Sequence, residues 1–141
     1  MAWGTLVLCS EFKGKLVDEK GEPVTDVKVI RRWKWEWTSG TGEDVTKTDE
    51  NGNFHFKQVN GSSFSARFMP HEPGIDTEIV AFTPNGEVTL FAVEKSNYSI
   101  DGELNDTGLE GPGINLICRS DLKPGVNDGP FWGTCSVTDK R

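Results

Sequence analysis

Residues 24–37 read Val-Thr-Asp-Val-Lys-Val-Ile-Arg-Arg-Trp-Lys-Trp-Glu-Trp (VTDVKVIRRWKWEW), and side chains of different kinds alternate along this stretch with a period of two. A period of two is the pattern of a β-strand, whose successive side chains point to opposite faces. One face carries Val27 and Val29 and then Arg31, Trp33, Trp35 and Trp37. The other face carries Lys28, Ile30, Arg32, Lys34 and Glu36.

This stretch is longer than the strand that a small sandwich needs, which is about seven to nine residues. We therefore expect Val27 and Val29 to lie in the core and the tryptophan end to extend beyond it. That end should pair with residues 44–48 (DVTKT) as a long hairpin arm. In this arrangement Trp33 is mostly buried, while Trp35 and Trp37 are partly available to solvent.

Three interpretations of the tryptophan stripe stay open. It can be core, which is the commonest role of alternating aromatic residues. It can be an edge that binds a protein, because Trp and Arg dominate interface hot spots and Arg31, Arg32 and Lys34 lie among the indoles. It can also be a platform that stacks on sugars, although such platforms usually have amide or carboxylate donors nearby and WKWEW supplies only charges.

Turn signals elsewhere in the chain also indicate β-structure. Asn51-Gly52 precedes the alternating Phe54 and Phe56, and residues 84–86 (PNG) interrupt a hairpin over residues 78–94. We assign residues 38–44 (TSGTGED) to a loop and find no convincing helix. Seven or so short strands separated by turns predict an all-β chain, a transthyretin-like or immunoglobulin-like β-sandwich, with residues 1–141 as a single domain.

The composition limits the partners. The chain has a formal net charge of −7, which argues against nucleic acid and against anionic membranes because both attract a positive field. No run of about 18 apolar residues exists that would insert into a membrane. We expect a protein partner. Exposed tryptophans can also self-associate, so a homodimer is a further expectation.

The three cysteines predict one disulfide. Cys118 and Cys135 flank a loop rich in glycine and proline, with strand-like residues on both sides. A bridge between them would stabilise the fold by about 3 kcal/mol in the chain-entropy model. It would place the chain in an oxidising compartment. We expect the periplasm, with a signal peptide removed ahead of Met1-Ala2, and we expect Cys9 to be buried on the first strand.

Residues 11–60 resemble the carboxypeptidase regulatory-like domain, which has a transthyretin-like β-sandwich. The resemblance rests on GKLVDEKGEPVTDVKVI (14–30) and TKTDENGNFHFKQV (46–59). The matching positions are Gly14, Val17, Asp18, Gly21, Pro23, Val27, Val29, Thr48, Asp49, Gly52, Phe54, Phe56 and Val59. The resemblance implies the fold and little about function, because such domains are accessory modules in many proteins.

The second half lacks the Gly-x-Tyr segment usual near the end of such domains. It carries instead FMPHEP (68–73), NYSIDGEL (97–104) and INLIC (114–118). With the Trp-rich strand, this whole-chain pattern resembles small bacterial proteins of unknown function that are similar to immunity proteins of type VI secretion systems. The resemblance implies a protein that binds and occludes a cognate antibacterial toxin. A cell-envelope carbohydrate-binding or accessory domain is the alternative, and a domain cut from a larger surface protein is a third option.

No catalytic motif is present, so we expect a protein that is not an enzyme and has no cofactor. The two histidines lack the spacing of a zincin helix, and there is no Gly-x-Ser-x-Gly elbow or phosphate-binding glycine loop. His71, Glu72 and Asp76 could form a metal site, but we predict no metal.

Two loops add candidate partner-binding residues to the tryptophan strand. Prolines flank His71 and Glu72, which stiffens that segment, although a plain surface crossover would look the same. Phe131 and Trp132 lie inside the 118–135 loop, where apolar rings either contact a partner or fold back into the sandwich. The candidate set is Arg31, Arg32, Trp33, Lys34, Trp35, Trp37, His71, Glu72, Phe131 and Trp132.

Overall fold

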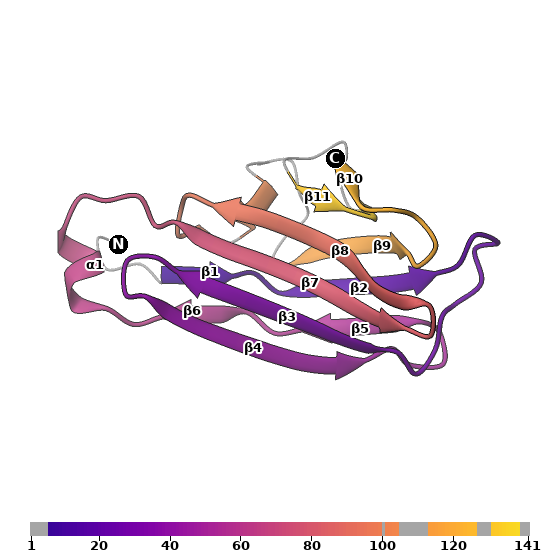
Figure 1. Cartoon of the computed structure of the whole chain (residues 1–141). Helices are drawn as coiled ribbons and strands as arrows, with labels where there is room; N and C mark the ends of the chain where they lie inside the picture. The colour runs from indigo at the N-terminus through magenta and orange to yellow at the C-terminus, as the bar shows by residue number, and fades with distance from the viewer. Residues whose placement is uncertain (1–5, 100, 105–112, 127–130, 139–141) are drawn as a thin grey trace.

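The computed structural model of the chain describes residues 6–99, 101–104, 113–126 and 131–138. Within these residues the fold is the predicted all-β sandwich (Figure 1). One layer is a six-stranded sheet in the order β10-β11-β8-β7-β3-β4. Its strands are β3 (Lys28–Trp35), β4 (Gly40–Lys47), β7 (Ile75–Thr83), β8 (Gly86–Lys95), β10 (Gly125–Val126) and β11 (Trp132–Gly133).

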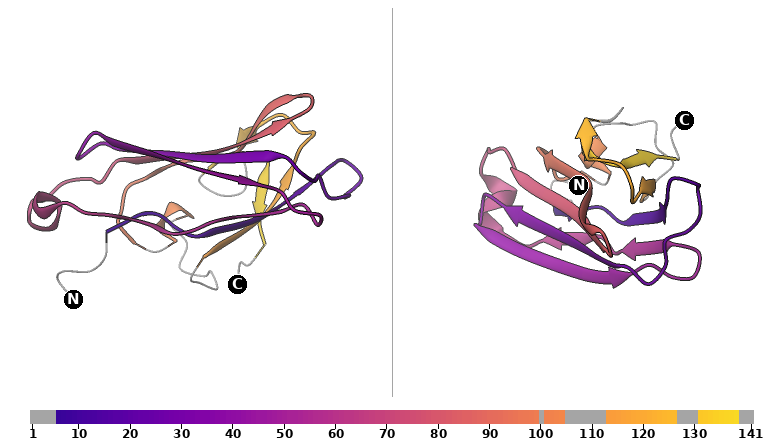
Figure 2. Two further views of the ribbon diagram at one scale, coloured as in Figure 1. Left: turned by 90° about the horizontal axis from the view of Figure 1, so that it is seen from below. Right: turned by 45° about the vertical axis from the view of Figure 1, so that its right-hand side comes forward.

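The second layer is made of two sheets that lie end to end (Figures 1 and 2). Four strands run in the order β12-β9-β2-β5, and two more form the pair β1-β6. Their bounds are β1 (Leu6–Cys9), β2 (Phe12–Val17), β5 (Asn53–Phe56), β6 (Val59–Gly61), β9 (Ile114–Arg119) and β12 (Cys135–Val137). Only residues 10–11 separate β1 from β2, and only residues 57–58 separate β5 from β6. The second layer is therefore interrupted at one level across two neighbouring strands.

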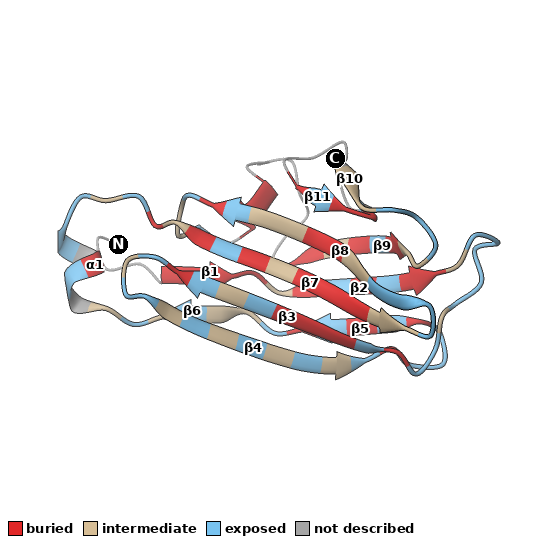
Figure 3. Cartoon of the chain, in the orientation of Figure 1, coloured by how far each residue is buried: buried red, intermediate tan, exposed pale blue. Residues whose placement is uncertain are grey.

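Two apolar clusters lie between the layers, and most buried residues belong to one of them (Figure 3). The larger lies under the four-stranded sheet and contains Phe12, Val29, Phe54 and Phe91. The smaller lies under β1-β6 and contains Trp35 with Leu6, Leu8 and Ile75.

The predicted first hairpin forms, but the predicted pairing is wrong. Residues 44–47 pair with residues 28–31, whereas Trp33 and Trp35 lie opposite Gly42 and Gly40. Asp26 has a positive φ of 56°, so the long strand begins at Lys28 and ends at Trp35. The loop predicted over residues 38–44 is wrong beyond residue 39, because Gly40 begins β4. A Cβ at Gly42 would overlap the Trp33 indole. Glycine at this position therefore leaves space for the ring inside a continuous strand.

A short helix, α1 (Phe64–Phe68), contradicts the expectation of none. Ser63 caps it, since its hydroxyl oxygen accepts the Ala66 N–H at 3.2 Å. The helix joins the two layers at the end of the sandwich where the smaller cluster lies. A 3-10 turn, η1 (Gly102–Leu104), also places two residues in the interior.

The disulfide between Cys118 and Cys135 is confirmed. The two cysteines lie opposite each other on β9 and β12, and both are fully buried. Disulfides are typical of oxidising compartments. Residues 127–130 of the predicted loop lie outside the described part of the chain.

Changing both cysteines to alanine should lower the free energy of unfolding by about 3 kcal/mol, because the bridge restricts the unfolded chain. Urea denaturation of the variant and of the wild type, with and without reductant, measures this loss. Reductant should destabilise the wild type and leave the variant unchanged. Equal midpoints for wild type and variant without reductant would contradict the prediction.

Candidate functional site

The tryptophan stripe faces the interior of the sandwich. The pair β1-β6 covers this end of β3, so it does not extend beyond the fold as we expected. Trp35 is only 4% exposed and is the buried member of the three, whereas Trp33 and Trp37 are partly buried at its sides. The expectation that Trp33 is the mostly buried ring, with Trp35 partly available, is therefore wrong. Trp35 belongs to the smaller cluster, and Trp33 and Trp37 pack against it.

Arg31 is also an interior residue, which corrects its assignment to a partner-binding surface. Its side chain is fully buried and lies where the second layer is interrupted. The guanidinium donates to the carbonyl oxygens of Ser10 and Lys57, which lie in the two breaks, and forms an ion pair with Asp44 on β4. Arg31 thus satisfies backbone groups that the interrupted ladder leaves without strand partners.

Arg32 and Lys34 lie on the opposite face of β3 from the indoles. Both are exposed, with Arg32 paired to Glu43 and Glu78 and Lys34 to Glu36. Because successive side chains of a strand alternate, Arg32 and Lys34 point away from the face that carries the rings of Trp33 and Trp35.

A chain of hydrogen bonds joins the stripe to the proline-flanked loop. Trp35 donates its Nε1–H to the hydroxyl oxygen of Tyr98 at 2.9 Å, and that hydroxyl lies 2.7 Å from Nε2 of His71. Nδ1 of His71 lies 2.6 Å from the carbonyl oxygen of Met69. Since a carbonyl only accepts, Nδ1 of His71 donates to Met69, and Nε2 exchanges a hydrogen bond with the Tyr98 hydroxyl. Burial raises the pKa of Tyr98, which keeps the hydroxyl protonated.

Trp37 completes this end of the molecule. Its indole stacks on the His71 ring with centroids 3.9 Å apart, and its Nε1–H donates to Ser65 of α1 at 3.0 Å. Next to this supported surface, Phe68 and Met69 are 50% and 54% exposed. We call Trp37, Phe68, Met69, His71 and Tyr98 the sandwich-end cluster.

The sandwich-end cluster combines exposed apolar side chains with a rigid base. The ring nitrogens of His71 both have partners, and the segment lies between Pro70 and Pro73. A partner that binds here would therefore immobilise few side chains, which reduces the entropic cost of binding. Sequence reasoning selected Trp37 and His71 but missed Tyr98 and Phe68. Tyr98 is the single tyrosine of the chain, and this is the feature of the sequence that could have identified it.

The remaining candidate residues lie in different parts of the fold. Phe131 is 5% exposed and stacks on Phe91 in the larger cluster, so its assignment to a partner surface is corrected: it fills the core. Trp132 is 48% exposed on β11, and Glu72 is exposed beside His71. Ile117 and Leu122 are exposed and line a shallow depression near the disulfide. This second apolar surface is separate from the sandwich-end cluster in the fold.

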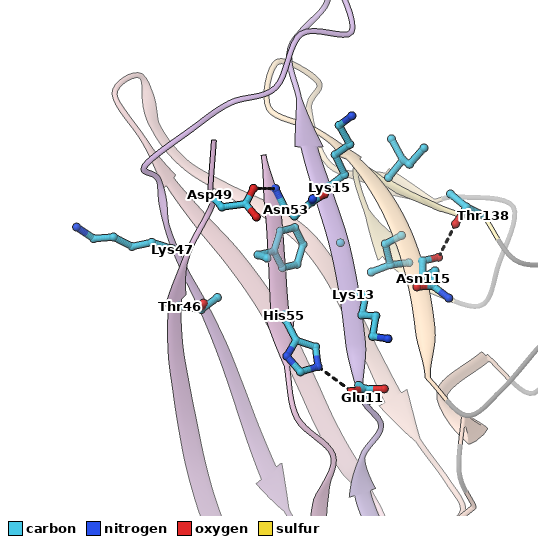
Figure 4. Close-up of a pocket in the computed structure, with 14 residues that line it drawn as sticks. Glu11, Lys13, Lys15, Thr46, Lys47, Asp49, Asn53, His55, Asn115 and Thr138 are labelled. Atoms are coloured by element: carbon cyan, nitrogen blue, oxygen red, sulfur yellow. Dashed lines mark hydrogen bonds and ion pairs between the residues drawn. The ribbon is translucent and has the colours of Figure 1, made fainter. Parts of the chain in front are cut away.

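An open polar groove crosses the outer face of the four-stranded sheet (Figure 4). Lys13 and Lys15 of β2, His55 of β5 and Lys47 of β4 line it. Glu11 lies 2.7 Å from Nε2 of His55 and holds that ring in place. The lining also includes Glu11 and Asp49, so the groove carries charges of both signs. Its three lysines suit an acidic group of a partner.

A buried polar layer separates the two apolar clusters. Lys95 donates from Nζ to the carbonyl oxygen of Val7 at 2.7 Å and lies 3.7 Å from Glu103. Glu103 accepts hydrogen bonds from the backbone N–H and the hydroxyl of Ser10. Burial lowers the pKa of Lys95. Burial also raises the pKa of Cys9 to about 11, so this thiol stays protonated at neutral pH and is a poor nucleophile.

No group of three or more His, Cys, Asp or Glu side chains among the described residues could hold a metal ion. His71 and Asp76, which the sequence allowed as a metal set with Glu72, therefore do not form one here. In the same part of the chain, no helix is long and apolar enough to cross a membrane.

Residues 12–119 match the family described as a Domain of unknown function (DUF6795). No curated protein matches the chain. Among solved structures, the fold is similar to a 3-chlorocatechol 1,2-dioxygenase from Rhodococcus opacus 1CP, at 13% identity and a TM-score of 0.43, over 77% of this chain and 56% of that one. A 9R-lipoxygenase from Cyanothece PCC8801 matches at 11% identity and a TM-score of 0.35, over 87% of this chain and 18% of that one. The chain thus spans little more than half of the first and under a fifth of the second, and similarity at this level transfers no activity.

Proposed function

Since the chain belongs to the family described as a Domain of unknown function (DUF6795), its role has to be inferred from its own surface, and we propose that it is a non-enzymatic module that binds another protein. The observation that carries this proposal is the pair of exposed apolar side chains, Phe68 and Met69, in the segment that leads to His71, whose ring stacks on Trp37 and has partners at both nitrogens. Aromatic residues and methionine are enriched at protein interfaces, and rigid apolar anchors dominate their energetics.

We propose further that the partner is a secreted antibacterial toxin and that the domain is its immunity protein in the periplasm. The resemblance to small bacterial proteins similar to type VI immunity proteins supports this finer assignment. The disulfide supports an oxidising compartment, and the net charge of −7 favours a basic partner surface. The mechanism is steric: the sandwich-end cluster inserts into the active-site region of the toxin and blocks access of substrate.

Affinity capture from the source organism, with quantitative mass spectrometry, tests this function. The baits are the wild type and a Phe68→Ser/Met69→Ser variant, whose changed side chains are already half exposed and should leave the fold intact. We expect one protein that the wild type enriches and the variant loses at least tenfold. A partner retained equally by both baits would contradict the assignment of the site. Sugar-dependent quenching of tryptophan fluorescence, without any captured protein, would favour the carbohydrate-binding alternative.

A further inference from the structure

Strand β4 is a long free edge of the six-stranded sheet. Within the described residues it pairs with β3 alone, over all eight positions from Gly40 to Lys47 and without a bulge (Figure 1). It contains no proline, and Val45 is 57% exposed at its centre. Sandwich proteins usually blunt such an edge with prolines, bulges, short strands or charged side chains, because free backbone groups invite another strand. Of these devices, β4 has the charged side chains of Glu43, Asp44 and Lys47.

The direction of the backbone groups along β4 follows from its pairing. Thr48 donates its N–H to the carbonyl of Val27 at 2.9 Å, so the backbone groups of this residue point toward β3. In a regular strand, alternate residues direct N–H and C=O to opposite edges. The register with β3 has no shift, so Glu43, Val45 and Lys47 direct their N–H and C=O groups away from β3, to the free edge.

The side chains of these residues are self-complementary. When two copies of β4 run antiparallel about a two-fold axis at Val45, Val45 lies opposite its own copy, and Glu43 lies opposite Lys47 on both sides of it. All three are exposed on the outer face. On the inner face the same register places Asp44 opposite Thr46, whose hydroxyl can donate to the carboxylate. Opposite charges and apolar residues that face each other across strands stabilise a sheet.

Other registers lose this match. An axis at Glu43 places two Glu43 carboxylates opposite each other, and an axis at Asp44 does the same for Asp44. An axis at Thr46 limits the overlap to residues 45–47 and gives Glu43 no partner in the second strand, and an axis at Gly42 places Glu43 opposite Thr41. Like charges directly opposite each other are destabilising, and among these registers the axis at Val45 is the one that places Glu43 opposite Lys47.

We propose that β4 is a homodimer interface, at which a second copy of this chain adds its own β4 to form one sheet continuous across both subunits. Three residue pairs in the overlap (43–47, 45–45 and 47–43) present the backbone groups that form hydrogen bonds. The contact is isologous: the same surface of each copy meets its equivalent across a two-fold axis, so assembly stops at the dimer. Closed symmetry of this kind is typical of soluble homo-oligomers. It uses none of the residues of the sandwich-end cluster, so it stands or falls independently of the proposed function.

Proline substitution tests the interface. In Val45→Pro the lost N–H points to the free edge, so pairing with β3 stays intact and the edge position tolerates proline. Thr41→Pro is the matched control. The backbone N–H of Thr41 also points to the free edge, but Thr41 lies outside residues 43–47, which overlap in the proposed dimer. In sedimentation velocity over a concentration series, we expect a dimer for the wild type and for Thr41→Pro, and a monomer for Val45→Pro. A wild type that stays monomeric throughout, or a Val45→Pro variant that still dimerises, would overturn the proposal.

Charge reversal tests the register. Glu43→Lys and Lys47→Glu should each raise the dimer dissociation constant at least tenfold, because each places like charges opposite each other. The double variant should restore the dimer. Their intramolecular ion pairs, to Arg32 and Asp26, are exposed and contribute little to folding. Two single variants that dimerise as well as the wild type would overturn the assigned register.

Disulfide cross-linking gives a second test of the interface. Residues in a hydrogen-bonded antiparallel pair have Cα atoms about 5.5 Å apart, within the range that a disulfide spans. Val45→Cys should therefore cross-link across the axis under mild oxidation, and Thr41→Cys should not. The native cysteines do not interfere, because Cys9 is buried and the other two are bonded. Equal cross-linking of both variants would contradict the proposal.

Discussion

Replacing Glu103 with alanine should lower the free energy of unfolding by about 3–5 kcal/mol, the cost of removing one partner from a buried ion pair. The side chains of Glu103 and Lys95 are both fully buried. Without Glu103, the Lys95 ammonium keeps only the Val7 carbonyl among the partners described above, and Ser10 loses the acceptor of its N–H and its hydroxyl. The polar layer then carries an uncompensated charge between two apolar clusters.

Chemical denaturation with urea measures this loss, and Glu72→Ala provides the matched control. Glu72 is an exposed carboxylate, so its removal should change stability by less than about 0.5 kcal/mol. The double variant Lys95→Met/Glu103→Leu should lose less than the sum of the two single changes, because no charge is left buried. A loss below about 1 kcal/mol in Glu103→Ala would show that the pair is not buried as described.

Replacing Trp35 with alanine should cost about 3–5 kcal/mol, the usual range for a large aromatic side chain in a core. Trp35 is the most buried of the three indoles and packs against Leu8 and Ile75 in the smaller cluster. Its loss also removes the N–H that Tyr98 accepts. Trp37→Ala, at the partly exposed edge of the same cluster, should cost less than half as much. Thermal and urea unfolding of both variants check the order, and equal losses would contradict it.

Much of the fold follows from local patterns. The alternation in residues 24–37 predicted β3, the Pro84-Asn85-Gly86 turn predicted the β7–β8 hairpin, and the cysteine spacing predicted the bridge. These features depend on residues close in sequence or on one pair of side chains. The all-β class follows from them without knowledge of how the layers are arranged.

The exposure of the tryptophans could not be predicted in the same way. Alternation assigns side chains to one face of a strand, but it does not reveal whether another layer covers that face. The strand Leu6–Cys9, distant in sequence, covers the stripe. The role of Arg31 was hidden for a related reason: its partners exist because the second layer is interrupted at residues 10–11 and 57–58. A break of two residues leaves no clear signal in the sequence.

The location of the candidate site was predicted in part. Trp37 and His71 were selected separately, and the structure brings them into a stack. Arg31 and Phe131 were selected because their residue types are common at interfaces, yet both are buried for structural reasons. Replacement of Trp35 is therefore a poor test of binding, since its loss would destabilise the fold itself.

The central claim is that the sandwich-end cluster binds a protein partner, and one affinity measurement tests it most directly. Isothermal titration with the captured partner should compare the wild type, Met69→Lys and Leu122→Lys. Both side chains are about half exposed, but Leu122 lies near the disulfide, away from the cluster. A charge at a hot spot should weaken binding at least about thirtyfold, the equivalent of 2 kcal/mol. We therefore expect that loss for Met69→Lys and a change of less than about twofold for Leu122→Lys; the reverse pattern would contradict the account.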